Sequence, residues 1–347
     1  MTITIDDKII EVSEDKTILD VAQEEGIYIP TLCHYEGVPD DASCMVCVVK
    51  NKKNNELLPA CNTFVEEGMD IATNSEDIIA FRKKVVKMLL KEHRAECEAP
   101  CVSVCPAKYN TPLLHKIISD GMLKDAVSLV AKEIGDEEIQ CHYCDARCEK
   151  VCNRAKIDTS LSIREIRDFL SQKITIDDNT DPIQKKGNDY SFQSKLGPIT
   201  KEEMKKRLIL HGADGNKKEK ITEYLSVSSE AKLCLQCQCA AIDDCQLREI
   251  ASKLQIEDDG DKITCVPITY KVSISSNLVF ESTKCIKCGL CTRVDNDIDA
   301  RAALCFINKG IDLEVSEAIG VDFNNIPDDK AEKFITVCPT GALHKLQ

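Results

Sequence analysis

The chain has 347 residues, a formal net charge of −14 at pH 7 and 21 cysteines. This length allows two or three domains, each with its own core, and the acidic balance excludes an ordinary nucleic-acid-binding protein, because phosphate recognition needs clustered Lys and Arg. No basic-then-apolar segment opens the sequence and no apolar run approaches about 18 residues, so we expect no secretory signal, no membrane span and a cytoplasmic location. Recurring C-x2-C pairs favour metal binding over a disulfide scaffold.

The first 80 residues are predicted to form a small domain of strands and one helix. The alternating runs MTITIDD and KIIEV predict a hairpin, and TILDVAQEEG predicts a short amphipathic helix that ends at Gly26. Four thiolates in this region suit a 2Fe-2S cluster, whereas the C-x2-C pair alone leaves zinc as an alternative. These cysteines have the spacing C-x10-C-x2-C-x13-C and are Cys33, Cys44, Cys47 and Cys61.

The segments SCMVC, LLPAC and EEGM resemble the N-terminal domain of the complex I large iron–sulfur subunit and of iron-only hydrogenases. The resemblance implies a β-grasp, ferredoxin-like fold in which those four cysteines bind a 2Fe-2S cluster. A helix is predicted over residues 76–92, because Glu76 and Asp77 suit its first turn and apolar residues recur at helical spacing. In complex I this helix ends in a histidine that binds a cluster, with a cysteine four residues later, as for His93 and Cys97 here. The alternative is an ordinary histidine at a helix end.

Residues 93–152 contain two bursts of metal-binding residues, HRAECEAPCVSVCP and CHYCDARCEKVC. One histidine and seven cysteines match the ligand count of two 4Fe-4S clusters. The bursts are predicted to interleave, because Cys105 precedes Pro106 and in two-cluster ferredoxins the cysteine before a proline binds the other cluster. Between the bursts, two amphipathic helices broken at Gly121 are expected to wrap the clusters.

The segments PCVSVCP and CDARCEKVC resemble the iron–sulfur domain of the glutamate synthase small subunit and of dihydropyrimidine dehydrogenase. The resemblance implies two 4Fe-4S clusters, one bound by Cys97, Cys101 and Cys152, the other by Cys105, Cys144 and Cys148. The sequence departs from the family at the fourth ligands, since the leading cysteine pair is reduced to Cys97 and the family's Gln or Glu ligand falls near Arg167. His93 is the substitute assigned to the first cluster and Cys141 the one assigned to the second, and the reverse assignment stays open.

Residues 176–230 are polar and rich in turn residues, and they are predicted to be a linker. Enzymes of the glutamate synthase type place a G-x-G-x-x-G flavin domain after their iron–sulfur domain, and no such fingerprint occurs here. We therefore expect neither a bound flavin nor a pyridine-nucleotide module in this chain.

Two further cysteine groups lie in residues 231–347. The first contains Cys234, Cys237, Cys239 and Cys245, and its end, CQLREIA, resembles the histidine-and-three-cysteine segment of complex I and of hydrogenases. A 4Fe-4S cluster, a structural zinc ion and no metal all stay open for it. The second contains Cys285, Cys288, Cys291 and Cys338, with the spacing and remote Cys-Pro of a single 4Fe-4S cluster. Cys265 and Cys305 lie in apolar runs and are expected in the core.

The predicted class is α+β. The expected parts are a β-grasp 2Fe-2S domain over 1–80, a helical two-cluster domain over 81–175, the linker over 176–230 and a complex-I-like, ferredoxin-like domain over 231–347. The resemblances imply an iron–sulfur subunit with one 2Fe-2S and three or four 4Fe-4S clusters. It would relay electrons between a flavoprotein NAD(P)H dehydrogenase subunit and a second redox subunit, such as a hydrogenase or formate dehydrogenase.

No catalytic motif is visible, so enzyme activity is expected to belong to the assembly. The alternatives are a subunit that docks on a separate glutamate-synthase-like flavoprotein, a self-contained oxidoreductase acting at an incompletely ligated cluster, and a redox sensor or cluster-storage protein.

Overall fold

The computed structural model describes residues 1–13, 15–94, 96–134, 140–174, 190–194, 201–210, 221–257, 269–295 and 302–346. The chain divides into two compact units. The first unit comprises Met1–Ala95, Asp189–Leu196 and Asp243–Leu346, and the second comprises Glu96–Asn188 and Gly197–Ile242. The mixture of helices and sheets confirms the predicted α+β class, while the predicted domain boundaries stay predictions. In the described ranges, none of the helices combines the length and apolar character that a bilayer crossing requires.

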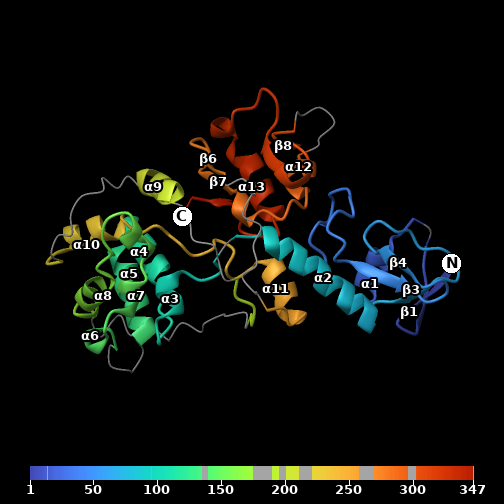
Figure 1. Ribbon diagram of the computed structural model, residues 1–347, viewed down its shortest axis with the longest axis horizontal. Helices are drawn as coiled ribbons and strands as arrows, with labels where there is room; N and C mark the ends of the chain where they lie inside the picture. The colour runs from blue at the N-terminus through green and yellow to red at the C-terminus, as the bar shows by residue number, and fades with distance from the viewer. Residues whose placement is uncertain are drawn as a thin grey trace. The chain divides into compact units, whose positions relative to one another are not determined.

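The first unit begins with a five-stranded mixed sheet, of which Figure 1 labels β1, β3 and β4. The strand order is β2-β1-β5-β3-β4, and β1 and β5 are parallel. Helix α1 begins at a capping box between Thr17 and Asp20 and packs its apolar face against this sheet. The alternating strand predicted at the N-terminus is present, with Ile3 and Ile5 buried in that core. The bounds are β1 Thr2–Ile5, β2 Lys8–Glu11, α1 Ile18–Glu24, β3 Val48–Asn51, β4 Glu56–Pro59 and β5 Asp70–Ala72.

Helix α2 (Glu76–Glu92) follows the sheet and has the predicted bounds. It buries Ile78, Val86 and Leu90, and its Arg82 donates from Nη2 to the backbone oxygen of Val48 at 2.7 Å. The helix ends at His93, whose backbone N–H donates to the oxygen of Leu89. The helix therefore carries His93 away from the sheet on a rigid support.

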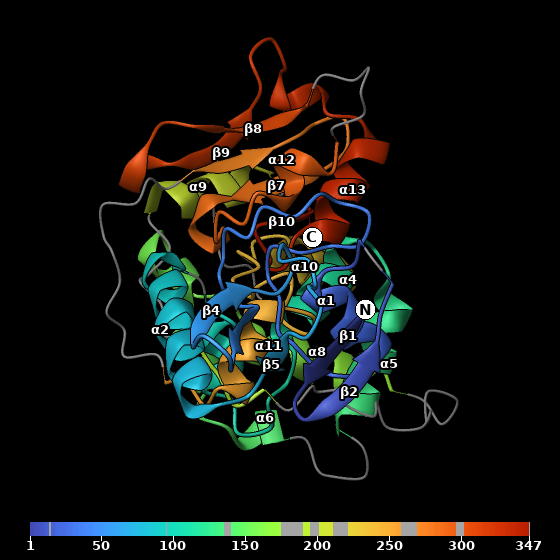
Figure 2. The ribbon, with the colours of Figure 1, turned by 90° about the vertical axis from the view of Figure 1, so that its right-hand side faces the viewer.

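The remainder of the first unit contains a three-stranded antiparallel sheet in the order β10-β7-β6 and a two-stranded ribbon of β8 and β9 (Figure 2). Helix α13 buries Ala331, Phe334 and Val337, the first two in a core shared with Phe280 of β7. The bounds are α11 Gln246–Lys253, β6 Tyr270–Val272, β7 Leu278–Glu281, α12 Leu290–Arg293, β8 Leu304–Ile307, β9 Glu314–Glu317, α13 Asp328–Val337 and β10 Leu343–Lys345.

The second unit is helical in its described residues. Helices α4, α5, α8 and α10 pack around a core that includes Leu114, Ile118, Val130 and Ile166. Gly121, with φ +80°, separates α4 from α5 as predicted, in a conformation that glycine adopts without a steric penalty. The bounds are α3 Pro100–Ser103, α4 Thr111–Ser119, α5 Leu123–Ile134, α6 Gln140–Tyr143, α7 Arg147–Lys150, α8 Ile163–Ser171, α9 Lys201–Leu210 and α10 Tyr224–Ala231.

Candidate metal centres

The four cysteines predicted to bind a 2Fe-2S cluster are brought together in the first unit. All four are buried, and the sulfurs of Cys47 and Cys61 lie 3.5 Å apart. Hydrogen bonds with the thiols of Cys44 and Cys61 lower the pKa of Cys33. Cys33 therefore contacts both of these cysteines. The backbone N–H of Val46 donates to the Cys44 sulfur at 3.5 Å. Four buried thiols with such a donor fit the anionic cysteine ligation of an iron–sulfur cluster.

The loop between Cys44 and Cys47 adopts an uncommon backbone conformation. Met45 has φ +55°, a value that few residues other than glycine adopt. This left-handed residue turns the chain back so that the N–H of Val46 reaches the sulfur of Cys44. The uncommon backbone conformation of Met45 therefore accompanies a hydrogen bond to the sulfur of a predicted ligand.

The second predicted set in the first unit also gathers in one place. Cys285, Cys288, Cys291 and Cys338 line a common apolar pocket with Phe280 and Leu343. Burial raises the pKa of Cys285 to about 12, with a further contribution from the Cys338 thiolate. Burial and repulsion from the other three thiolates raise the pKa of Cys291. A group that binds thiolates relieves this repulsion, so the donor set fits the predicted 4Fe-4S cluster.

Glycine is required beside this set. Gly289 has φ +75°, and a Cβ atom placed on it would lie 3.2 Å from the Phe306 ring. The N–H of Lys287 donates to the Cys285 sulfur at 3.3 Å. The C-x2-C-x2-C segment thus curls around the pocket with a backbone donor aimed at sulfur, and its ligation of a 4Fe-4S cluster stays a prediction.

Arg293, at the end of α12, connects the two sets of the first unit. Its Nη2 donates to the backbone oxygens of Cys33 and Cys288, each at 3.0 Å. Ser43 donates from its hydroxyl to the same Cys288 oxygen at 3.3 Å. The Cys33 thiolate also contributes to the raised pKa of Cys288, after burial and the thiolates of Cys338 and Cys285. The two candidate centres are therefore neighbours joined through one guanidinium, which sequence reasoning did not identify.

His93 is buried at the end of α2 in the first unit. Its Nδ1 lies 3.2 Å from the backbone oxygen of Lys284, so Nδ1 must be the protonated donor. A histidine that binds a metal ion commonly donates its other ring N–H to a carbonyl in this way. The cysteines assigned with His93 belong to the second unit, so this ligand set stays a prediction.

In the second unit, Cys105, Cys141, Cys144 and Cys148 line one pocket together with Tyr109 and Arg167. Burial raises the pKa of Cys141 to about 11 and that of Cys148 to about 12, and in both cases the thiolate of Cys105 adds to the rise. These four residues are the set assigned to the second central cluster. Their common pocket fits four-thiolate ligation.

Arg167 lies near the place where the resemblance to the glutamate synthase small subunit predicts a Gln or Glu ligand. Its side chain is buried, pairs with Glu133 and stacks 4.0 Å from the centroid of the Tyr109 ring. Its Nε and Nη1 atoms have no hydrogen-bond partner. A buried cation with unused donors in the wall of a cysteine-lined pocket suits an anionic cluster, although it cannot ligate iron.

Seven predicted ligands remain, and their neighbours in the structure differ from the groups predicted along the sequence. They are Cys97, Cys101, Cys152, Cys234, Cys237, Cys239 and Cys245. Cys101 and Cys152 pack with Cys234, and Asn153 donates to the sulfur of Cys237 at 3.4 Å. The N–H of Cys239 donates to the backbone oxygen of Cys97 at 3.3 Å. Cys245 begins α11 in the first unit.

Outside these groups, Cys305 is half-buried on β8 and Cys265 lies outside the described residues. No disulfide joins any cysteine that the structure describes. Nor do three His, Cys, Asp or Glu side chains of the described residues converge on the position of a single metal ion.

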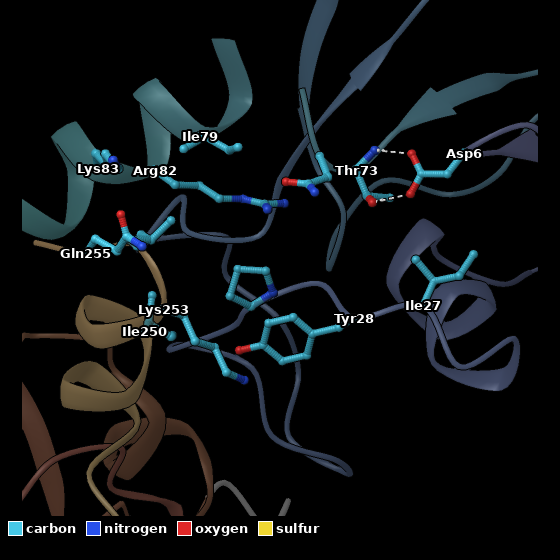
Figure 3. A pocket seen from close by; sticks show the side chains of 13 residues that line it. Asp6, Ile27, Tyr28, Thr73, Ile79, Arg82, Lys83, Ile250, Lys253 and Gln255 are labelled. Atoms are coloured by element: carbon cyan, nitrogen blue, oxygen red, sulfur yellow. Dashed lines mark hydrogen bonds between the residues drawn. The ribbon is translucent and has the colours of Figure 1, made fainter. Parts of the chain in front are cut away.

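A separate cavity of about 630 Å³ lies in the first unit (Figure 3). Figure 3 shows the side chains of Tyr28 and Arg82 bordering this space, with Lys253 beside the tyrosine ring. Lys253 Nζ is 3.9 Å from the Tyr28 ring centroid, and Nε of Arg82 has no hydrogen-bond partner. None of the described residues that line this cavity is a cysteine, so the cavity is distinct from the candidate metal centres.

Comparison with known proteins matches residues 1–76 to the family model of the 2Fe-2S iron-sulfur cluster binding domain. The chain is 30% identical over 172 residues to the alpha subunit of the NADPH-Fe(3+) oxidoreductase of Geobacter sulfurreducens, covering 45% of this chain and 20% of that protein. It is 28% identical over 95 residues to the mitochondrial NADH-ubiquinone oxidoreductase 78 kDa subunit of Candida albicans, covering 27% of this chain and 13% of that protein.

A third relative is the gamma subunit of the NAD-reducing hydrogenase HoxS of Cupriavidus necator, 38% identical over 95 residues, with 27% of this chain and 40% of that protein covered. The matches thus cover less than half the length of each of these relatives. A chain in the crystal structure of an NAD+-reducing [NiFe]-hydrogenase in the H2-reduced state has a similar fold, with a TM-score of 0.51, 15% identity, and coverage of 99% of this chain and 86% of that one. These findings confirm the predicted resemblance to complex I and hydrogenase subunits, and residues 1–76 match the 2Fe-2S iron-sulfur cluster binding domain.

Proposed function

We propose that this chain is an iron–sulfur electron-transfer subunit of a multisubunit oxidoreductase. The observation that carries the proposal is the juxtaposition of two cysteine sets in the first unit, joined by the Arg293 bridge between Cys33 and Cys288. Electron tunnelling slows steeply with distance, so centres that exchange electrons must lie close together. Two neighbouring cysteine-ligated centres support a relay better than a store of isolated clusters.

The chain's own residues would hold the centres and insulate them. Bound clusters accept and release single electrons, and the first unit buries their thiolates among apolar side chains such as Leu290 and Val337. Backbone N–H groups of Val46 and Lys287 donate to ligand sulfurs, which stabilises the more negative, reduced state of each centre. Burial and sulfur hydrogen bonds would therefore set the reduction potential of each centre, and the potentials would set the order in which electrons pass.

The proposed content is one 2Fe-2S cluster and four 4Fe-4S clusters, with zinc at the group beginning at Cys234 as the alternative to the fourth. The proposed partners are a flavoprotein NAD(P)H dehydrogenase subunit and a second redox subunit, such as a hydrogenase or formate dehydrogenase. The names of the relatives support this arrangement, since they include NADPH-, NAD- and NADH-linked oxidoreductases and a hydrogenase. A reducing, cytoplasmic compartment would keep so many thiols available for metal binding.

Anaerobic purification followed by iron, zinc and sulfide analysis tests this proposal. We expect about 18 iron atoms per chain, against about 14 with one zinc ion if zinc occupies the group beginning at Cys234. The reduced chain should pass electrons to an artificial acceptor but should not oxidise NADH or NADPH by itself. Tightly bound flavin with diaphorase activity, or an iron-free protein, would contradict the proposal.

A further inference from the structure

Thiols from three separate segments of the second unit lie together beneath Leu161 and Ile163. Cys234 is buried with these two residues, and Cys101, Cys148 and Cys152 pack against the cluster that the three form. Cys101 comes from the first central burst, Cys152 from the end of the second, and Cys234 from a segment about eighty residues further along the chain. Packing thus unites residues that the sequence order separates.

Cys237 is held to the same place by hydrogen bonds. Asn153, the residue after Cys152, donates from Nδ2 to the Cys237 sulfur at 3.4 Å. Arg154 donates from Nη1 to the backbone oxygen of Leu233 at 3.0 Å. These two bonds fix residues 152–154 against residues 233–237.

The backbone between Cys234 and Cys237 is also specified. Nη1 of Arg207 donates to the backbone oxygens of Leu235 and Gln236, at 3.4 and 3.1 Å. Gln236 adopts φ +46°, so the chain turns sharply between the two cysteines. A tight C-x2-C turn supported by a buried arginine is a formed ligand loop rather than an irregular connection.

Cys148 packs against the same cluster of side chains as Cys101 and Cys152. It also lines the other pocket with Cys105, Cys141 and Cys144, and it is assigned to that set.

We infer that Cys101, Cys152, Cys234 and Cys237 together ligate one 4Fe-4S cluster, an inference that rests on the proposed iron–sulfur function. In the related family a leading pair of cysteines supplies two ligands, and this chain has only Cys97 there. In the inferred set Cys234 and Cys237 take the place of that pair, so neither Cys97 nor His93 is needed. Cys239 is left out of this set, because its backbone N–H donates a hydrogen bond to the backbone oxygen of Cys97. The group beginning at Cys234 is accordingly divided between at least two sites.

The test compares single and double alanine variants of the anaerobically purified full chain by iron and zinc analysis and by EPR of the dithionite-reduced protein. We expect Cys152→Ala and Cys237→Ala each to lose about four iron atoms and the same EPR signal. The double variant should lose no more than either single variant, and Cys239→Ala should retain that signal. Cys152 and Cys237 variants that lose different signals, a double variant that loses about eight iron atoms, or zinc bound in place of iron would overturn the inference.

A second variant keeps every thiol and so tests the inference even if the cysteine variants fail to fold. Asn153→Ala removes the donor to the Cys237 sulfur, which should lower the midpoint potential of the one signal assigned to this cluster. Asn54→Ala, in an exposed turn, is the matched control and should change no potential. An unchanged potential in Asn153→Ala, or a shift of a signal that Cys152→Ala retains, would overturn the ligand assignment. A wild-type chain without iron would instead refute the proposed function.

Discussion

The two units gather their cysteines in different ways. In the first unit, each set follows a motif that can be read along the sequence, with C-x10-C-x2-C for one centre and C-x2-C-x2-C for the other. In the second unit, Cys101 and Cys152 pack with Cys234, which comes from a remote segment. Cysteine sets that are built on a sequence motif can be proposed from spacing, whereas cysteines that only tertiary packing brings together cannot.

The largest expected effect tests the compact motifs of the first unit. Cys47→Ala should remove the 2Fe-2S cluster, with loss of about two iron atoms, because the Cys47 sulfur lies beside that of Cys61 and no other thiol replaces it. EPR of the reduced protein should retain the signal of the Cys285–Cys338 centre. Full iron content in this variant would show that Cys47 is not a ligand.

Removing the bridge between the two first-unit centres should have the next largest effect. Arg293→Ala loses the hydrogen bonds that the two Nη atoms donate to the carbonyls of Cys33, Pro39 and Cys288, and the one that Nε donates to Gly289. We expect the free energy of unfolding to fall by about 3 kcal/mol. Denaturant titration measures this change, and Arg293→Lys is the matched control. Lysine keeps the charge but cannot span three carbonyls in fixed geometry, so it should restore only part of the stability. Equal stability of all three proteins would show that the bridge is unimportant.

The stability of the second unit should depend on pH through His115. His115 of α4 is fully buried without hydrogen-bond partners, and burial, aided by Arg167, lowers its pKa from 6.5 to about 3. The folded state therefore binds this proton less well than the unfolded state, and stability is lost as pH falls below about 6.5. The loss should be about 1.4 kcal/mol at pH 5.5 relative to neutral pH.

Hydrogen exchange of the α4 amides at pH 7.5 and pH 5.5 checks this expectation. His115→Leu should remove the difference attributable to this group while keeping the apolar packing against α5. The same pH dependence in the variant as in the wild type would show that another group is responsible.

The smallest expected effect concerns the potential of the pocket lined by Cys105, Cys141, Cys144 and Cys148. Arg167→Met should lower the midpoint potential of that cluster by tens of millivolts, because it removes a buried positive charge that stabilises the reduced state. Redox titration followed by EPR measures the shift. Arg147, which is exposed at the rim of the same pocket, provides the control as Arg147→Met and should have a smaller effect.

Much of the fold follows from local sequence. The helix over residues 76–92 and the break at Gly121 occur where the apolar period and the glycine predict them. The 2Fe-2S domain is likewise evident from its cysteine spacing, and the family match confirms it. In each case the sequence pattern that predicts the feature lies within one short segment, so the prediction does not depend on tertiary packing.

The features that the sequence did not reveal depend on long-range contacts. Arg293 joins its own segment to a backbone 260 residues away, and Asn153 reaches Cys237 across 84 residues. No local pattern marks either residue, although both lie within two positions of a cysteine motif. Polar residues next to such motifs are therefore the places to look for bridges and sulfur donors.

Magnetic coupling between the two centres of the first unit tests the relay most directly. We would reduce the anaerobically purified chain stepwise with dithionite and record EPR spectra at each potential. The account predicts that the 2Fe-2S signal broadens or splits as the centre held by Cys285, Cys288, Cys291 and Cys338 becomes reduced, since Arg293 contacts the ligand segments of both. Two signals that titrate without any mutual effect, or a protein that gives no iron–sulfur signal, would contradict it.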